Sequence, residues 1–157
     1  MAFIKKYGFW IFLIALAGYW GYRKWPHEIS ISEIQIERDG QMIPVTLKGD
    51  SALVVHYFAS WCGPCMKELP EWVDHLKELR AQGFQVVCIT DDEPSIVGRL
   101  KDNYNLPIER TESLNSINVF SIPMTYIYNA KGIQVKRIEG PLDWSNPELI
   151  VELNKLK

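Results

Sequence analysis

The pentapeptide Trp61-Cys62-Gly63-Pro64-Cys65 joins an apolar run to a helical pattern. The run before it, residues 52–58, is short and rich in β-branched and aromatic side chains, which predicts a buried strand. After it, apolar residues recur every three or four positions through residues 66–80, which predicts an amphipathic helix. Both cysteines are therefore expected on the first turn of that helix, where free backbone N–H groups and the helix dipole favour thiolate over thiol.

Two cysteines in this position predict thiol–disulfide chemistry. Cys62 is expected to be the nucleophile, because it is nearer the helix N-terminus and should be more exposed, and Cys65 the thiol that resolves the intermediate. Gly63 permits a tight turn, and Pro64 presets a helical φ without removing a needed N–H. The expected redox group is a Cys62–Cys65 disulfide, with no metal and no other cofactor.

Paired cysteines also occur in metal sites and peroxidases. Zinc usually needs four ligands, but the chain has no second C-x-x-C, and His27, His56 and His75 are scattered. A T-x-x-C motif, as in a peroxidase, does not occur in the sequence. Two alternatives remain: a disulfide oxidase or isomerase, and a module that delivers a metal on its two thiolates. Cys88 lies within an apolar strand pattern and is expected to be a buried, inert thiol.

The first 25 residues differ in character from the rest of the chain. Residues 7–22 carry no charge and lie between two basic pairs. A helix of this length spans about 24 Å, against roughly 30 Å of hydrocarbon, and flanking lysines and aromatic residues can close the gap. We expect residues 1–25 to be a membrane anchor and residues 26–157 to be one domain. The alternative is a signal peptide cleaved near Ala15-Leu16-Ala17.

Either alternative exports the domain, so we expect it on the periplasmic or extracytoplasmic side of a bacterial inner membrane, anchored by one span, or released into the periplasm. Beyond residue 25 the chain has 13 Lys and Arg against 19 Asp and Glu, a net charge of −6. An acidic domain without a basic patch argues against nucleic acid as a partner.

The remaining pattern predicts an α/β domain. Residues 29–37 and 42–47 should form a β-hairpin, and Asp91 and Asp92 should cap a helix that runs to about residue 104. The other expected elements are strands at 84–89, 106–110, 125–128 and 133–138, a short helix at 113–119, and a final helix from about 146 to the C-terminus. Crossovers of helical length between strands imply a mixed central sheet covered on both faces.

The motifs together resemble a known family. W-C-G-P-C after an apolar strand, with Ser121-Ile122-Pro123 further on, resembles the thioredoxin fold. The N-terminal segment, the hairpin and Glu68, three residues after the second cysteine, resemble the TlpA/ResA/CcmG branch of membrane-anchored thiol–disulfide oxidoreductases, over residues 31–156. The resemblance implies that Pro123 is a cis-proline facing the two sulfurs, that the Ile122 backbone pairs with substrate as an added strand, and that Glu68 tunes the thiol pair.

Two further residues complete the predicted site. His56 stands where thioredoxins have a buried aspartate that accepts a proton, so His56 is predicted to accept the proton of Cys65; the alternative is a hydrogen-bonded core histidine. Trp61 is predicted to shield the disulfide and to shape the contact surface.

The resemblance also implies partners. A Gly-Pro pair between the cysteines is typical of reducing thioredoxins, so we expect a reductase of protein disulfides. It would be recharged by a membrane thiol-transfer protein of the DsbD/CcdA kind, and it could serve cytochrome c maturation, in which apocytochrome cysteines are reduced before haem attachment.

Overall fold

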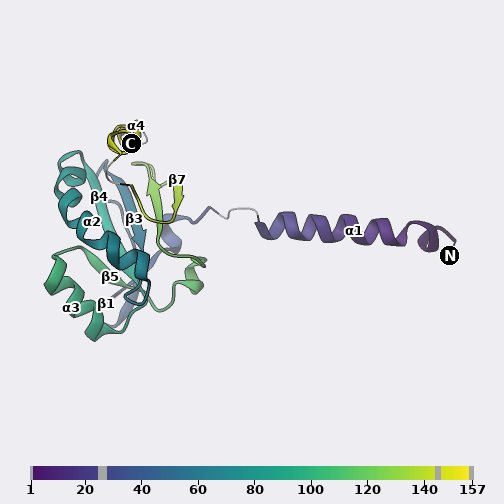
Figure 1. Ribbon diagram of the computed structural model, residues 1–157, viewed down its shortest axis with the longest axis horizontal. Helices are drawn as coiled ribbons and strands as arrows, with labels where there is room; N and C mark the ends of the chain where they lie inside the picture. The colour runs from purple at the N-terminus through teal and green to yellow at the C-terminus, as the bar shows by residue number, and fades with distance from the viewer. Residues whose placement is uncertain (1, 25–27, 144–145, 156–157) are drawn as a thin grey trace.

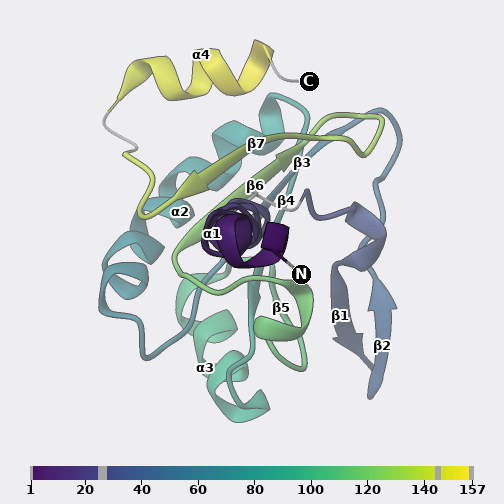
Figure 2. The ribbon, with the colours of Figure 1, turned by 90° about the vertical axis from the view of Figure 1, so that its right-hand side faces the viewer.

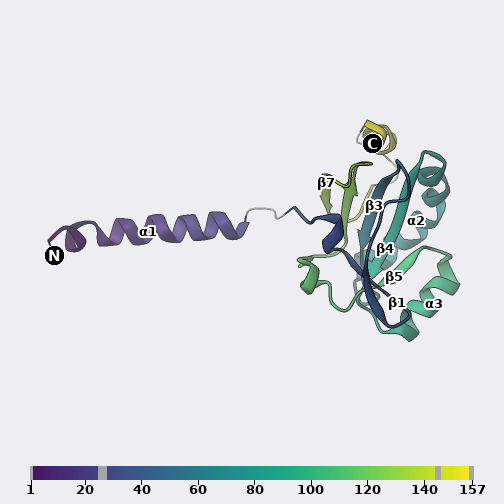
Figure 3. The same cartoon turned by 180° about the vertical axis from the view of Figure 1, so that it is seen from behind.

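The computed structural model describes residues 2–24, 28–143 and 146–155. Helix α1 (Ala2–Lys24) projects away from the domain, as the two side views show (Figures 1 and 3). Among the described residues, no helix combines the length and the apolar character needed to cross a membrane. The predicted domain boundary at residues 25 and 26 lies outside the described residues, as do the last two residues of the predicted C-terminal helix.

The domain is built on a five-stranded sheet in the order β5-β4-β3-β6-β7. Its strands are β3 (Ala52–Tyr57), β4 (Phe84–Thr90), β5 (Ile108–Arg110), β6 (Met124–Tyr128) and β7 (Gln134–Glu139). β3, β4 and β5 run parallel, whereas β6 and β7 pair antiparallel, which confirms the predicted mixed sheet. The central strand β3 is buried at every position, and this explains its continuous apolar sequence.

Three helices cover one face of this sheet. They are α2 (Gly63–Ala81), α3 (Pro94–Tyr104) and α4 (Pro147–Lys155). Their apolar residues share one core cluster with alternate residues of β3 and β4, such as Val54 and Val86. In α2 the buried positions Leu69, Trp72 and Leu76 follow the helical spacing that the sequence predicted.

The opposite face is covered without a long helix. The β-hairpin of β1 (Gln35–Arg38) and β2 (Gln41–Pro44) forms a separate two-stranded sheet, and it lies across the main sheet from α2 (Figure 2). Two single 3-10 turns, η1 (Ile31–Glu33) and η2 (Asn115–Ile117), accompany it. On this face the hairpin and the two turns form a second core cluster with the other alternate residues of β3, among them Val55.

Three boundary predictions on this face were wrong. The strand expected from residue 29 begins at Gln35, because η1 precedes it. The second strand ends at Pro44, because the next residue of the partner strand, Ile34, donates its N–H to the Ile31 carbonyl in the η1 turn at 3.2 Å instead of to this strand. The helix expected at 113–119 is only the turn η2, which ends where Asn118 adopts the left-handed conformation at φ 60°. The apolar residues that suggested longer elements cover the sheet as loops instead.

This topology brings three segments to one edge of the sheet. β3 ends at Tyr57, and α2 begins six residues later. β6 is antiparallel to β3, with Tyr57 opposite Met124, so the residues that precede β6 lie beside the start of α2. β4 is parallel to β3 and therefore ends at the same edge.

Candidate active site

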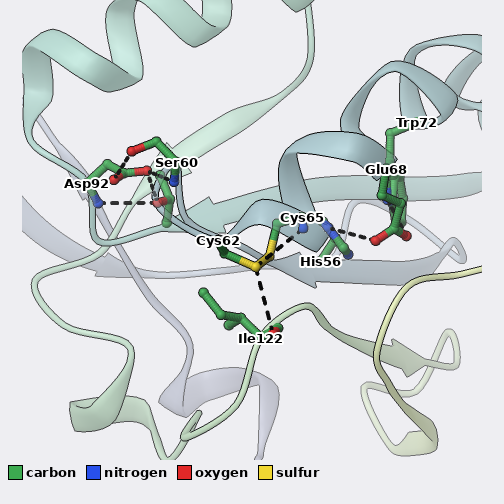
Figure 4. The surroundings of a disulfide bond; sticks show 9 residues. His56, Ser60, Cys62, Cys65, Glu68, Trp72, Asp92 and Ile122 are labelled. Atoms are coloured by element: carbon green, nitrogen blue, oxygen red, sulfur yellow. Dashed lines mark hydrogen bonds and ion pairs between the residues drawn. A yellow bond between two sulfur atoms is a disulfide. The ribbon is translucent and has the colours of Figure 1, made fainter.

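A disulfide joins Cys62 and Cys65 at this edge (Figure 4). Cys62 is the N-cap of α2 rather than a residue of its first turn, and its sulfur accepts a hydrogen bond from the Cys65 backbone N–H at 3.3 Å. Pro64 lies in the first turn, where its missing N–H costs nothing. Cys62 retains 6% of its surface and Cys65 none, so an attacking or attacked group can reach only Cys62.

The peptide bond between Ile122 and Pro123 lies opposite the disulfide and is cis, as the family resemblance implied. The carbonyl oxygen of Ile122 lies 3.8 Å from the Cys62 sulfur (Figure 4). A backbone segment beside the exposed sulfur can pair with an extended peptide, since peptides commonly bind by adding a strand.

Glu68 is buried behind the disulfide on α2. One carboxyl oxygen, Oε1, accepts hydrogen bonds from Trp72 Nε1 at 3.0 Å and from the Leu142 N–H at 2.9 Å. Burial raises the pKa of Glu68, and the hydrogen bonds from Leu142 and Trp72 oppose that rise. The other oxygen, Oε2, lies 4.0 Å from His56 Nε2, and neither atom has a hydrogen-bond partner among the residues that the structure describes.

His56 is fully buried in β3, between Cys88 on β4 and Thr125 on β6. Its Nδ1 lies 3.0 Å from Thr125 Oγ1. Burial lowers the pKa of His56 to about 3, so the imidazole is neutral at ordinary pH. Burial also raises the pKa of Cys88 to about 12, which leaves this thiol protonated, as predicted for a buried inert cysteine.

Glu68 and His56 therefore form a buried acid–base pair. Each presents one unpartnered atom to the other at 4.0 Å, and burial favours the uncharged form of both groups by raising the pKa of Glu68 and lowering that of His56. A cavity of about 340 Å³ lies beside Glu68 and the first turn of α2. It is lined by Gly63, Pro64, Lys67, Glu68, Glu71, Pro141 and Leu142.

Asp92 holds the loop that precedes the cysteines. Its carboxylate accepts hydrogen bonds from Ser60 N–H at 2.8 Å, Ser60 Oγ at 2.7 Å and Thr90 Oγ1 at 2.7 Å. The expected role of Asp91 and Asp92 as helix caps was wrong, because Glu93 is the N-cap of α3. The carboxylate of Asp92 points to the neighbouring loop rather than to the helix, as Figure 4 shows.

Trp61 stands next to the nucleophile with 74% of its surface exposed. An indole so exposed contributes little to the core, which favours the predicted role in the contact surface. Among the described residues, no three His, Cys, Asp or Glu side chains gather as a metal site would require.

Comparison with known proteins identifies the family to which a chain with this site belongs. The model of the AhpC/TSA family matches residues 35–135, a range that contains both cysteines and the cis-proline. The chain belongs to the AhpC/TSA family.

Two relatives of this chain are named as a thiol-disulfide oxidoreductase and a thioredoxin-like protein. The thiol-disulfide oxidoreductase ResA of Halalkalibacterium halodurans is 26% identical over 134 residues, 82% of this chain and 76% of that protein. The thioredoxin-like protein YneN of Bacillus subtilis is 30% identical over 151 residues, 83% of this chain and 87% of that protein. These relatives confirm the resemblance to the TlpA/ResA/CcmG type.

A solved structure supports the fold. The thiol:disulfide interchange protein of Chlorobium tepidum, a thioredoxin family protein, superposes with a TM-score of 0.63 at 22% identity, over 82% of this chain and 97% of that one. The chain therefore has the thioredoxin-like fold that the sequence predicted.

Within the family fold, the structure brings together the residues that the sequence predicted to react, to tune the thiol pair or to pair with substrate. Figure 4 shows Glu68, His56 and Ile122 around the disulfide of Cys62 and Cys65, and the cis peptide bond to Pro123 follows Ile122. Sequence reasoning missed the support from Asp92. A signal was present, since a carboxylate two residues after a strand parallel to β3 lies near the residues that follow β3.

Proposed function

We propose that the chain reduces disulfide bonds of exported proteins, with Cys62 and Cys65 as the reacting pair. The observation that carries this proposal is the disulfide itself, capping α2 opposite the cis Ile122–Pro123 peptide, with only Cys62 open to solvent. The chain is a thiol–disulfide oxidoreductase, the activity that the ResA relatives are named for.

The reaction begins with the reduced pair. The Cys62 thiolate attacks one sulfur of the substrate disulfide, a mixed disulfide forms, and the other substrate sulfur leaves as a thiolate that takes a proton from water. Cys65 then loses its proton and attacks Cys62, which closes the Cys62–Cys65 disulfide and releases the second substrate sulfur. Two electrons pass from the cysteine pair to the substrate, and the state described by the structure is the oxidised product.

The second step needs a base for the buried Cys65 thiol. Cys65 and Glu68 are three residues apart on α2 and share one face of the helix, and Glu68 Oε2 lies 4.0 Å from His56 Nε2 (Figure 4). The Glu68–His56 pair takes the proton of Cys65 as the mixed disulfide resolves and passes it to solvent through the adjoining cavity.

A reductase outside the cytoplasm requires a source of electrons. We infer that a membrane dithiol protein of the DsbD/CcdA kind reduces the Cys62–Cys65 disulfide again. We also infer that α1 tethers the domain to the extracytoplasmic face of a bacterial membrane, a role supported by its uncharged stretch and by exposed apolar side chains such as Phe9 and Ile14. Cleavage as a signal peptide is the alternative for this segment.

The resemblance to the TlpA/ResA/CcmG type supports apocytochrome c as one substrate whose cysteines this chain reduces. The direction of electron flow is decided by the reduction potential, since C-x-x-C proteins range from about −270 mV for reductants to about −120 mV for oxidants. A potential near the upper limit would assign the chain to the oxidases instead.

The test is a trap for the mixed disulfide. In Cys65→Ser the resolving thiol is gone, so substrate proteins should stay bound to Cys62 and be released by dithiothreitol. The matched control Cys62→Ser removes the exposed nucleophile and should trap nothing. Equal trapping by both variants would overturn the proposal. It would also be overturned if neither variant trapped a protein and the wild-type chain failed to reduce insulin.

A further inference from the structure

Two aromatic side chains of the domain stand out in solvent. Among the described residues 28–143 and 146–155, Trp61 and Phe120 are the only aromatic side chains that are exposed, at 74% and 77%. Leaving large apolar groups in water forgoes the stability that their burial would give, and such patches commonly mark binding surfaces. The two belong to different segments, one before the cysteines and one before the cis-proline.

Both side chains line the same cavity, which has a volume of about 350 Å³. Its other walls include Ile122, Leu114, Val119 and Asp91. This volume falls within the roughly 300–1,000 Å³ typical of small-ligand sites. This cavity is distinct from the cavity beside Glu68, because the two share no lining residue.

The wall that carries Phe120 is held in place by hydrogen bonds. The Leu114 N–H donates to Asp91 Oδ2 at 3.1 Å, which ties the η2 segment to the end of β4. Within that segment the Val119 N–H donates to the Leu114 carbonyl at 3.0 Å, and Leu114 and Val119 are themselves buried. A preformed wall costs less to order when a ligand binds.

The cavity adjoins the path that a substrate must follow. A disulfide attacked by Cys62 has to reach the exposed sulfur, and the Ile122 carbonyl, 3.8 Å from that sulfur, belongs to a residue that also lines the cavity. An extended chain advances about 3.3 Å per residue, so residues one or two positions from the attacked cysteine pass over the cavity.

We propose that this cavity receives one bulky apolar side chain of the substrate, within two residues of the attacked cysteine, and that Phe120 sets this preference. The inference rests on the proposed function and specifies its substrate class. Asp91 is the only ionisable residue among the described residues that line the cavity, so an acidic side chain at the same position is disfavoured.

The test compares short peptides that differ at one position. Each peptide carries a single cysteine in a disulfide with thionitrobenzoate, followed by Phe, Gly or Glu, and release of the coloured thiol reports attack by Cys62 in the reduced full chain. We expect the Phe peptide to react about tenfold faster than the Gly peptide, a difference of about 1.4 kcal/mol, and the Glu peptide to be slowest. In Phe120→Ser the Phe-to-Gly ratio should fall below about threefold, and Phe120→Leu should restore most of it.

A ratio within one variant cancels any general loss of protein, and Ile133→Ser is the matched control. Ile133 is 55% exposed in the turn between β6 and β7, outside the cavity, so its variant should keep the wild-type ratio. An equal ratio in wild type and Phe120→Ser, or a wild-type preference for Gly, would overturn the inference. A reduced wild-type chain that attacks neither the peptides nor the symmetrical thionitrobenzoate disulfide would overturn the proposed function instead.

Discussion

Glu68 allows the buried acid–base pair to be tested by two substitutions that differ in one respect. Glu68→Gln keeps an oxygen that can accept from Trp72 Nε1 and the Leu142 N–H, and its amide can donate to the free His56 Nε2. Glu68→Ala removes the acceptor and leaves both donors without it. The two variants therefore separate the hydrogen bonds from the ionisable proton.

The magnitude follows from the two donors. Each buried donor that loses its acceptor costs about 1–3 kcal/mol, so Glu68→Ala should lose about 2–6 kcal/mol of unfolding free energy. Water that enters from the adjoining cavity can satisfy part of this demand, which places the expected loss near the lower end. Glu68→Gln should match or exceed the wild-type stability at neutral pH.

The pH dependence has a definite sign. Burial raises the pKa of Glu68 in the folded state, so between the unfolded and folded pKa values the folded state holds a proton that the unfolded state has released. The stability of the wild type therefore falls as pH rises through this window, by about 1.4 kcal/mol for each unit of pKa difference. Glu68→Gln lacks this dependence, and its advantage over the wild type should grow as pH rises.

Urea unfolding of the oxidised protein, measured from pH 4.5 to pH 8, gives both quantities. The difference between wild type and Glu68→Gln cancels the titration of groups that the two share. Equal stabilities for the Ala and Gln variants would contradict the hydrogen-bond argument. If the unfolding free energy of Glu68→Gln falls relative to that of the wild type as pH rises, the raised pKa of Glu68 is contradicted.

Three other residues offer sharp tests. Burial lowers the pKa of His56 to about 3, so between pH 6.5 and 3 the unfolded state binds a proton that the folded state refuses; stability should fall as pH drops through this range, and His56→Leu should flatten that slope in urea unfolding. Asp92→Ala removes the acceptor of one buried and two partly buried hydrogen bonds and should cost about 2–4 kcal/mol, because the two partly buried donors can turn to water; Asp92→Asn, which keeps an acceptor oxygen, should cost less, as thermal unfolding would show. Cys88 is buried with its pKa raised to about 12, so iodoacetamide should label no thiol of the oxidised native protein and one thiol in urea, as counted by mass spectrometry.

Local pattern was enough to predict the elements that carry the cysteines. The continuous apolar run of β3 and the helical spacing of α2 each extend over several residues, and the strand-to-helix junction places Cys62 at a helix N-terminus whatever surrounds it. Predictions failed where short segments cover the sheet without regular structure. Apolar residues around η1 and η2 bury themselves as loops, so their spacing carries no strand or helix period.

The sequence by itself determined the chemistry of this protein, because Trp61–Cys65 and the elements on either side are contiguous. The tertiary structure decided what surrounds that chemistry. Ser60 and Asp92 are 32 residues apart and Cys62 and Ile122 are 60 apart, and only the pairing of β3 with β4 and β6 brings them together. The same pairing buries His56 opposite Glu68. Periodicity shows which face of an element is buried, but it does not show which residue of another element lies against it.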